Sequence, residues 1–136
     1  MEMSIGRRNI TFGWIWILVG VVIGAFMGMW SFNGPMLSPV GDYSSLPRRM
    51  LRLSHIAFIA LAMINILYGY EIDKIRVNAK LKNLGSKSMI YGAALMPVLL
   101  LIAVYYEPAK YLTVIPACMV ITAVAVMVWG RKQKSL

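Results

Sequence analysis

The feature that most constrains this chain is the absence of charged residues from long stretches of its sequence. No Asp, Glu, Lys or Arg lies between Asn9 and Gly41, and three later apolar stretches carry almost none. A helix needs about 17–25 mostly apolar residues to cross the hydrocarbon core of a bilayer. Residues 10–30, 51–70, 88–106 and 111–130 meet this requirement, so the sequence predicts four transmembrane helices.

Composition supports the same class of protein. Hydrophobic residues make up 60% of the chain and charged residues 14%, whereas a typical soluble domain carries about 25% charged residues. Within lipid, only helices satisfy their own backbone polar groups without closing a barrel. The four spans cover most of the 136 residues and leave no room for a soluble catalytic domain. We therefore expect a single all-α domain over residues 1–136, a four-helix membrane bundle without catalytic activity of its own.

The basic residues predict how these helices are oriented. Cytoplasmic segments of membrane proteins carry an excess of Lys and Arg. With the N-terminus in the cytoplasm, ten basic residues fall on the cytoplasmic side: Arg7, Arg8, Lys74, Arg76, Lys80, Lys82, Lys87, Arg131, Lys132 and Lys134. Four fall on the other side: Arg48, Arg49, Arg52 and Lys110. We therefore expect both termini in the cytoplasm and a multi-pass protein of a bacterial-type inner (plasma) membrane.

The segments between the spans carry further expectations. Residues 107–110 are a short link, which predicts a tight antiparallel hairpin of the third and fourth spans. In residues 71–87 apolar side chains recur at helical spacing, so we expect the second span to continue as a helix towards Leu84 and to stop at Gly85. The basic residues of that segment face either anionic lipid or a partner subunit. Residues 31–50 combine Pro and Gly with apolar side chains, and we expect an ordered loop across the mouth of the bundle.

A row of glycines marks one face of the first span. Gly20, Gly24 and Gly28 follow one another at four-residue spacing, and Gly13 lies seven residues before Gly20. Small residues let a neighbouring backbone approach closely, which matters where lipid removes the hydrophobic drive between helices. The pattern predicts helix packing, either within the bundle or against another subunit. The alternative is close approach of a flat cofactor such as haem or a chlorin.

The single histidine of the chain is the strongest candidate for chemistry. His55 lies about one turn inside the second span, and Arg48 and Arg52 precede it by seven and three residues, so the three share one helical face. An ionisable residue inside a membrane span is by default a hypothesis for a functional site. Imidazole nitrogen binds haem iron, and guanidinium groups pair with carboxylates such as haem propionates. One hypothesis for this face is therefore a b-type haem, with His55 as the metal ligand.

The same residues also allow a simpler interpretation. An interfacial histidine hydrogen-bonds a neighbouring helix, and arginines at that depth bind lipid phosphates. If haem is present, its second axial ligand is not another histidine of this chain. Met27, Met29 or a residue of a partner chain are then the candidates.

Polar residues inside the second span form a second stripe. Ser54, Asn65 and Tyr68 lie on it, and buried amides in lipid hydrogen-bond neighbouring helices at about 0.6–2 kcal/mol. We expect these residues to hold helices together; the alternative is contact with a quinone or another substrate. In the third span Pro97 lies mid-helix, where proline removes one backbone hydrogen bond.

Several functions are disfavoured by what the spans lack. Cys118 is the only cysteine, so the chain has no intrachain disulfide and no cysteine-based metal cluster. Asp and Glu are absent from all four predicted spans, whereas an intramembrane acid is the usual relay of proton-coupled or cation-coupled transporters. A small transporter is therefore the third of our hypotheses.

The first hypothesis is a small non-catalytic accessory subunit of a larger inner-membrane complex, respiratory or photosynthetic, that transfers electrons. The second is a b-type haem-binding electron-transfer subunit that uses His55, with Arg48 and Arg52 at the propionates. Both predict the lipid bilayer and other membrane subunits as partners, and neither predicts nucleic acid.

Overall fold

The computed structural model describes residues 4–30 and 39–133, and the regular elements in these ranges are all helical. They are α1 (Ile5–Trp30), α2 (Leu46–Ile72), α3 (Ala79–Ile102), the 3-10 helix η1 (Glu107–Thr113) and α4 (Val114–Lys132). Four helical segments are long and apolar enough to cross a membrane, the last of them comprising η1 and α4. The prediction of an all-α membrane protein with four spanning helices is confirmed at this level.

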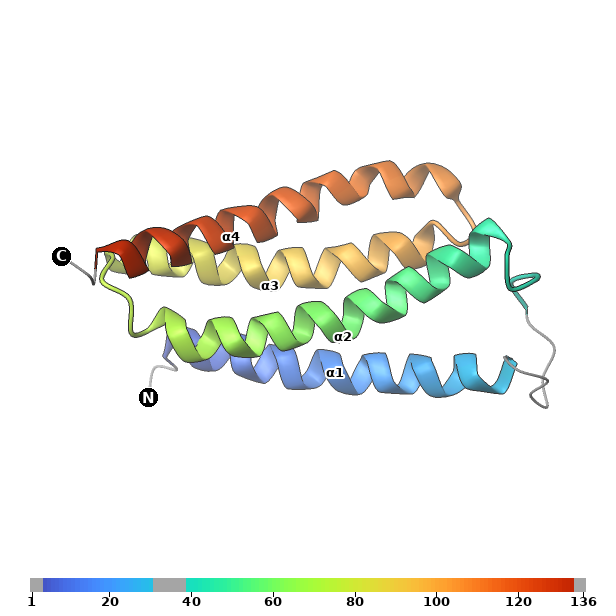
Figure 1. Ribbon diagram of the computed structural model, residues 1–136, viewed down its shortest axis with the longest axis horizontal. Coiled ribbons are helices and arrows are strands. Elements are labelled where there is room, and N and C mark those ends of the chain that lie inside the picture. Colours follow the sequence, from blue (N-terminus) through green and yellow to red (C-terminus); the bar gives the residue numbers. More distant parts are fainter. Residues whose placement is uncertain (1–3, 31–38, 134–136) are drawn as a thin grey trace.

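The two middle helices of the sequence form the centre of the fold. α2 packs along α3, α1 packs mainly on α2, and α4 packs mainly on α3. In Figure 1, α1 and α4 lie on opposite sides of the α2–α3 pair. The first residues of α1 and the last residues of α4 are at the same end of the molecule, together with the α2–α3 connection (Figure 1).

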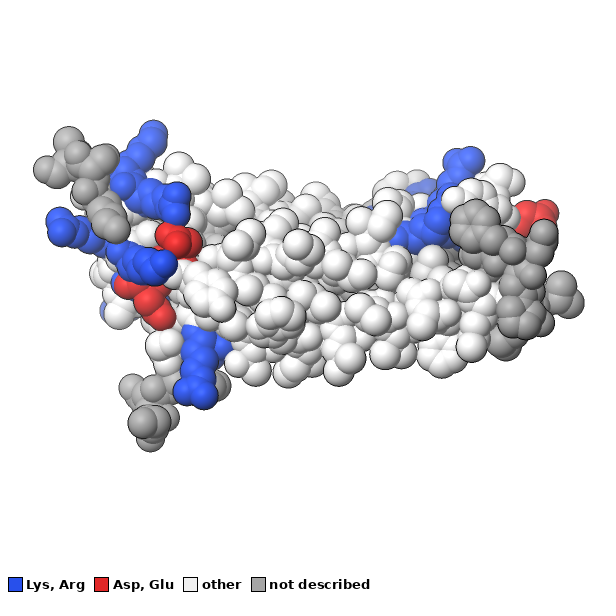
Figure 2. Space-filling view, turned by 60° about the horizontal axis from the view of Figure 1, so that its bottom comes forward, with Lys and Arg blue, Asp and Glu red and all other residues white. Residues whose placement is uncertain are grey.

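Charged residues gather at the two ends of the molecule and leave the middle bare (Figure 2). We call the end with the chain termini the basic end, because its helix ends and connection carry Arg7, Arg8, Lys74, Arg76, Lys80, Lys82, Arg131 and Lys132. The opposite end holds Arg48, Arg49, Arg52 and Lys110. An uncharged band between two charged ends is the distribution that a bilayer requires.

The helices extend beyond the apolar stretches of the sequence, because polar side chains cap them. α2 begins at Leu46, where Ser45 Oγ accepts a hydrogen bond of 3.4 Å from Arg48 N. α3 begins at Ala79, where Asn78 Oδ1 accepts a bond of 2.8 Å from Leu81 N. Serine and asparagine are favoured at this position because their oxygens satisfy free N–H groups of the first turn.

The expectation that the second span continues as a helix towards Leu84 is wrong. α2 ends at Ile72, residues 73–78 form the connection, and residues 79–84 belong to α3. The cap at Asn78 starts a new helix, and Gly85 lies inside that helix instead of ending it. Gly85 is buried where the hydroxyl of Tyr68 packs against it, so this glycine serves close packing.

The link between the third and fourth spanning segments comprises residues 103–106, so it has the expected length of four residues but lies before the predicted 107–110. α3 ends at Ile102, and the chain reaches α4 through a turn and η1. The two helices still pack side by side as an antiparallel hairpin (Figure 1). We expected an ordered loop over residues 31–50. Residues 31–38 of it lie outside the described part of the chain. Residues 39–45 form turns, and Gly41 has a φ of 80°.

Candidate functional site

Gly13 and Gly20 of α1 lie where α2 leaves no room for a side chain. A Cβ built on Gly13 would lie 2.8 Å from the carbonyl oxygen of Ala62, and one on Gly20 would lie 2.7 Å from Cγ1 of Ile59. Both distances are shorter than van der Waals contact, so the two helices approach as closely as a hydrogen side chain allows. Gly28, in contrast, is exposed, and among the described atoms nothing lies within 4 Å of its Cβ position.

A close glycine pair lies at the basic end, and one of its members, Gly6, has no part in the sequence prediction. Gly6 of α1 and Gly69 of α2 face each other so closely that a Cβ on either would collide with the carbonyl oxygen of the other. The backbone N–H of Gly6 also donates a hydrogen bond of 3.2 Å to Asp73 Oδ2. The signal was available, because Gly6 lies seven residues before Gly13 and extends the same helical face.

The structure brings the glycine face and the single histidine together. A Cβ on Gly24 would lie 2.6 Å from Cε1 of His55 and 3.1 Å from its Nε2, so the imidazole packs on the backbone of α1. His55 is half-buried. The two features that the sequence presented separately, one on each span, therefore belong to one contact.

The arginines of this face are placed in different surroundings. The side chain of Arg48 is 3% exposed. Arg52 is half-buried and lies over the ring of Tyr43, with Cζ at 4.0 Å from the ring centroid. Arg49, which lies off the His55 face of the helix, is exposed. Arg48, Arg52 and His55 thus form one basic face at the opposite end of the molecule, and we call this set the basic face of α2.

Two nitrogen atoms of this face are buried without a hydrogen bond. They are Nη1 of Arg52 and Nδ1 of His55, and neither has a hydrogen-bond partner in the part of the chain that the structure describes. A buried polar atom without a partner costs about 1–3 kcal/mol, and more if it is charged. Such atoms are rare in native proteins, and ordered water, a bound ion or a functional role accounts for them where they occur.

The two methionines suggested as axial ligands lie in different environments. Met27 is 9% exposed and packs in an apolar cluster with Leu51 and Val104. Met29 is 44% exposed on the surface of α1. Among the described residues, no three His, Cys, Asp or Glu side chains are grouped as in a multidentate metal site.

A second polar cluster joins three helices inside the membrane-spanning region. Asn9 Nδ2 of α1 donates to Asn65 Oδ1 of α2 at 2.8 Å, and Asn65 Nδ2 donates to the carbonyl oxygen of Met89 in α3 at 3.1 Å. Ser86 Oγ of α3 donates to Asn9 Oδ1. These three polar side chains are between 0% and 2% exposed. Asn65 was predicted to hold helices together, whereas Asn9 was read only as the flank of the first span and Ser86 as part of a linker.

A third set of bonds surrounds the proline in α3. Trp16 Nε1 of α1 donates to the carbonyl oxygen of Ala93 at 3.0 Å, and Ser54 Oγ of α2 donates to that of Pro97 at 2.7 Å. In a regular helix the Ala93 carbonyl would accept the N–H of residue 97, which proline lacks. The Trp16 indole replaces this missing donor. Tyr68, the last residue of the predicted stripe, has a buried hydroxyl without a hydrogen-bond partner among the described residues.

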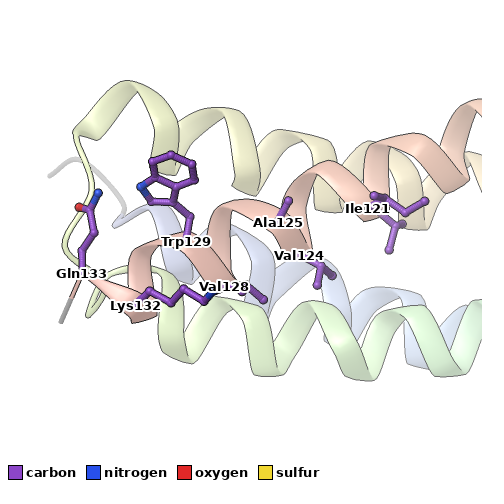
Figure 3. Close-up of a pocket in the computed structure, with 8 residues that line it drawn as sticks. Ile121, Val124, Ala125, Val128, Trp129, Lys132 and Gln133 are labelled. Carbon is purple, nitrogen blue, oxygen red and sulfur yellow. The ribbon is translucent and has the colours of Figure 1, made fainter. Parts of the chain in front are cut away.

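An apolar groove of about 770 Å³ runs along α4 (Figure 3). Its walls are Val120, Ile121, Val124, Ala125, Val128, Trp129, Lys132 and Gln133. Figure 3 shows Val124, Val128 and Lys132 on one side of the helix and Trp129 on the other. All of its lining residues belong to α4 or to Gln133, which directly follows that helix.

Ion pairs hold the basic end together. Glu71 of α2 accepts from Arg131 of α4 at 2.6 Å and from Lys74 at 3.1 Å. Asp73 binds the first turn of α1 through Gly6. Both acids of this end that the structure describes are therefore engaged within the chain, and the end keeps an excess of positive charge. No protein-family model, no curated protein and no solved structure matches the chain.

Proposed function

We propose that this protein is a small non-catalytic subunit of a larger inner-membrane complex, with electron-transfer complexes of respiration or photosynthesis as the class. The basic end faces the cytoplasm in this proposal, because its excess of Lys and Arg follows the positive-inside rule. Both chain ends, which lie at that end, are then cytoplasmic.

The proposal rests on what the buried polar side chains bind: they form hydrogen bonds to other helices of the same chain. Asn9, Ser54, Asn65 and Ser86 are buried, and each hydrogen-bonds another helix of the same chain. In the described part of the membrane interior these side chains stabilise the fold and do not converge on a cavity. A chain whose interior polar groups hold its own helices together suits a structural role.

The outward faces supply the surfaces for neighbouring subunits. α1 packs on α2 through its glycine face. Its remaining surface is apolar and exposed, and Trp14, Leu18 and Phe26 are each more than half exposed. On the other side of the fold, α4 presents the apolar groove. Lipid covers such faces in an isolated subunit, and partner helices cover them in a complex.

Purification from the native membrane in a mild detergent tests this function. A tagged copy expressed at its natural level is expected to carry other membrane chains at a constant ratio through affinity and size-exclusion steps. A monodisperse monomer with no co-purifying chain would contradict the proposal. The same tag on an unrelated membrane protein of similar size controls for chains that bind the resin.

A second candidate function, a b-type haem subunit, is favoured by the unpaired nitrogens at the basic face of α2. His55 Nδ1 is buried without a hydrogen-bond partner in the described chain. An imidazole nitrogen would hold the iron, and Arg48 and Arg52 would pair with the propionates. Bound haem would supply one-electron chemistry, and the protein's part is to position it and set its surroundings. A visible absorption spectrum of protein from its native membrane tests this candidate.

A further inference from the structure

The basic face of α2 has an excess of hydrogen-bond donors over acceptors. A guanidinium carries five N–H donors and no acceptor. One face of the Arg52 guanidinium is covered by the ring of Tyr43, while its Nη1 is buried without a hydrogen bond. Within the described chain Arg52 takes part in no ion pair. Of the two acids described at this end, Glu107 is bound to Lys110, and Asp42, next to Tyr43, is exposed and forms no ion pair with a described residue. A half-buried cation with a buried, unpaired N–H group is stabilised by an anion beside it.

The position of the face selects the kind of anion. Arg48 lies outside the apolar stretch 51–70 of α2, Arg52 is the second residue of that stretch, and the ring of Tyr43 packs on the Arg52 guanidinium. Tyr rings and long basic side chains with this arrangement lie at the level of lipid headgroups. Phosphate oxygens present several acceptors in the geometry that a guanidinium fork binds in a bidentate manner.

The helices also separate where this face begins. His55 packs on Gly24, but one turn further along α1 nothing described lies within 4 Å of the Cβ position of Gly28. Figure 1 shows α2 bending away from α1 towards Leu46, its first residue. The donors of Arg52 and His55 therefore lie near the end at which α2 diverges from α1, where Met27 of α1 still packs on Leu51.

We propose that the basic face of α2 binds the phosphate group of a phospholipid, with Arg52 as the main ligand and Arg48 and His55 beside it. The anion accepts hydrogen bonds from the Arg52 guanidinium, and the imidazole of His55 contributes its Nδ1. The inference goes beyond the proposed function and does not depend on a partner subunit. Free inorganic phosphate offers the same chemistry, so the experiment must distinguish the two sources.

Native mass spectrometry of the whole chain, released from micelles that contain dioleoyl phosphatidylglycerol, tests the proposal. The wild type is expected to keep one lipid adduct after the others are stripped. Arg52→Gln is expected to lower the population of that adduct about tenfold, the effect of losing a charge-assisted hydrogen bond. Arg49→Gln, which removes the same charge from the exposed side of the same turn, is expected to leave it unchanged. Equal loss in both variants would overturn the site.

Two further measurements keep the result interpretable. Arg52→Lys keeps the charge without the planar fork, and it is expected to retain the adduct partly; size-exclusion profiles show whether each variant is folded. Total phosphorus of the extensively washed wild type needs no variant at all, and its absence would overturn the proposal. An adduct with inorganic phosphate alone, or with the mass of haem, would overturn the assignment to a lipid.

Discussion

Trp16 Nε1 donates a hydrogen bond of 3.0 Å to the carbonyl oxygen of Ala93, the acceptor that Pro97 leaves without its backbone donor. The indole ring is held in place by neighbours, since it stacks on Phe12 at 4.9 Å and lies 5.4 Å from the ring of Phe58. A side chain of α1 thus completes the backbone of α3. This contact links two helices that otherwise share only a small interface.

Replacing the indole donor is expected to destabilise the protein only while the proline is present. Trp16→Phe leaves the Ala93 carbonyl without a donor and should lower the free energy of unfolding by about 1–3 kcal/mol. In a Pro97→Ala background residue 97 has its N–H again, so the same substitution should cost markedly less. Equilibrium unfolding in mixed detergent micelles measures this double-mutant cycle.

Trp14→Phe is the matched control, because Trp14 is 60% exposed on the same helix. It should change the stability by less than about 0.5 kcal/mol. Identical costs of Trp16→Phe in the two backgrounds would show that the indole does not act through the free carbonyl.

The asparagine pair inside the membrane region is expected to contribute to stability as a unit. Asn65→Leu removes the bonds to Asn9 and to the Met89 carbonyl, and should cost about 0.6–2 kcal/mol. Asn9→Leu added to it should cost less than in the wild type, because its partner is already gone. Thermal unfolding in detergent measures both, and strictly additive losses would argue against a shared cluster.

The glycines of α1 are expected to differ sharply in their tolerance of a methyl group. Gly13→Ala would place Cβ 2.8 Å from the Ala62 carbonyl oxygen, so the helices must move apart, at about 1–3 kcal/mol. Gly28→Ala meets no described atom within 4 Å and should be neutral or slightly stabilising. Unfolding curves of the two variants provide the comparison. If Gly28→Ala lowered the free energy of unfolding more than Gly13→Ala does, Gly28 would be in a packing contact that the described residues do not show.

If haem is bound, substitutions on the His55 face of α2 are expected to lower haem occupancy, and a substitution off that face is not. His55→Ala should abolish the Soret band, because it removes the iron ligand. Arg52→Ala should lower haem occupancy, whereas Arg49→Ala should leave it nearly intact, since Arg49 is exposed and lies off the His55 face. Absorbance at the Soret maximum relative to protein gives the occupancy. Equal losses in the two arginine variants would count against the propionate assignment, and a wild type without chromophore would exclude the haem function.

Most of what could be predicted from the sequence concerns the membrane. The absence of charge from the span of α1 indicated a spanning helix because burying an unpaired charge in hydrocarbon is costly. The same reasoning located α2, α3 and α4. The boundaries were less accurate at the basic end, where Asn78 starts α3 with a single hydrogen bond and no change in hydropathy accompanies it.

The candidate site could be predicted only in part. The spacing of Arg48, Arg52 and His55 placed them on one face of one helix, since helical periodicity depends on local geometry alone. That Gly24 is the surface on which His55 packs required the two helices to be docked in one register. Asn9 was missed because its partner, Asn65, lies 56 residues away in the sequence.

The sequence by itself determined that this protein is a set of spanning helices, which of its residues share a helical face, and that charge lies at both ends. These properties follow from transfer free energies and from the helical repeat, which each segment carries alone. Only the tertiary structure decided which faces meet: Gly13 with Ala62, and Trp16 with the carbonyl that Pro97 leaves open. Docking depends on shape and hydrogen-bond complementarity between distant segments, and no local pattern records it.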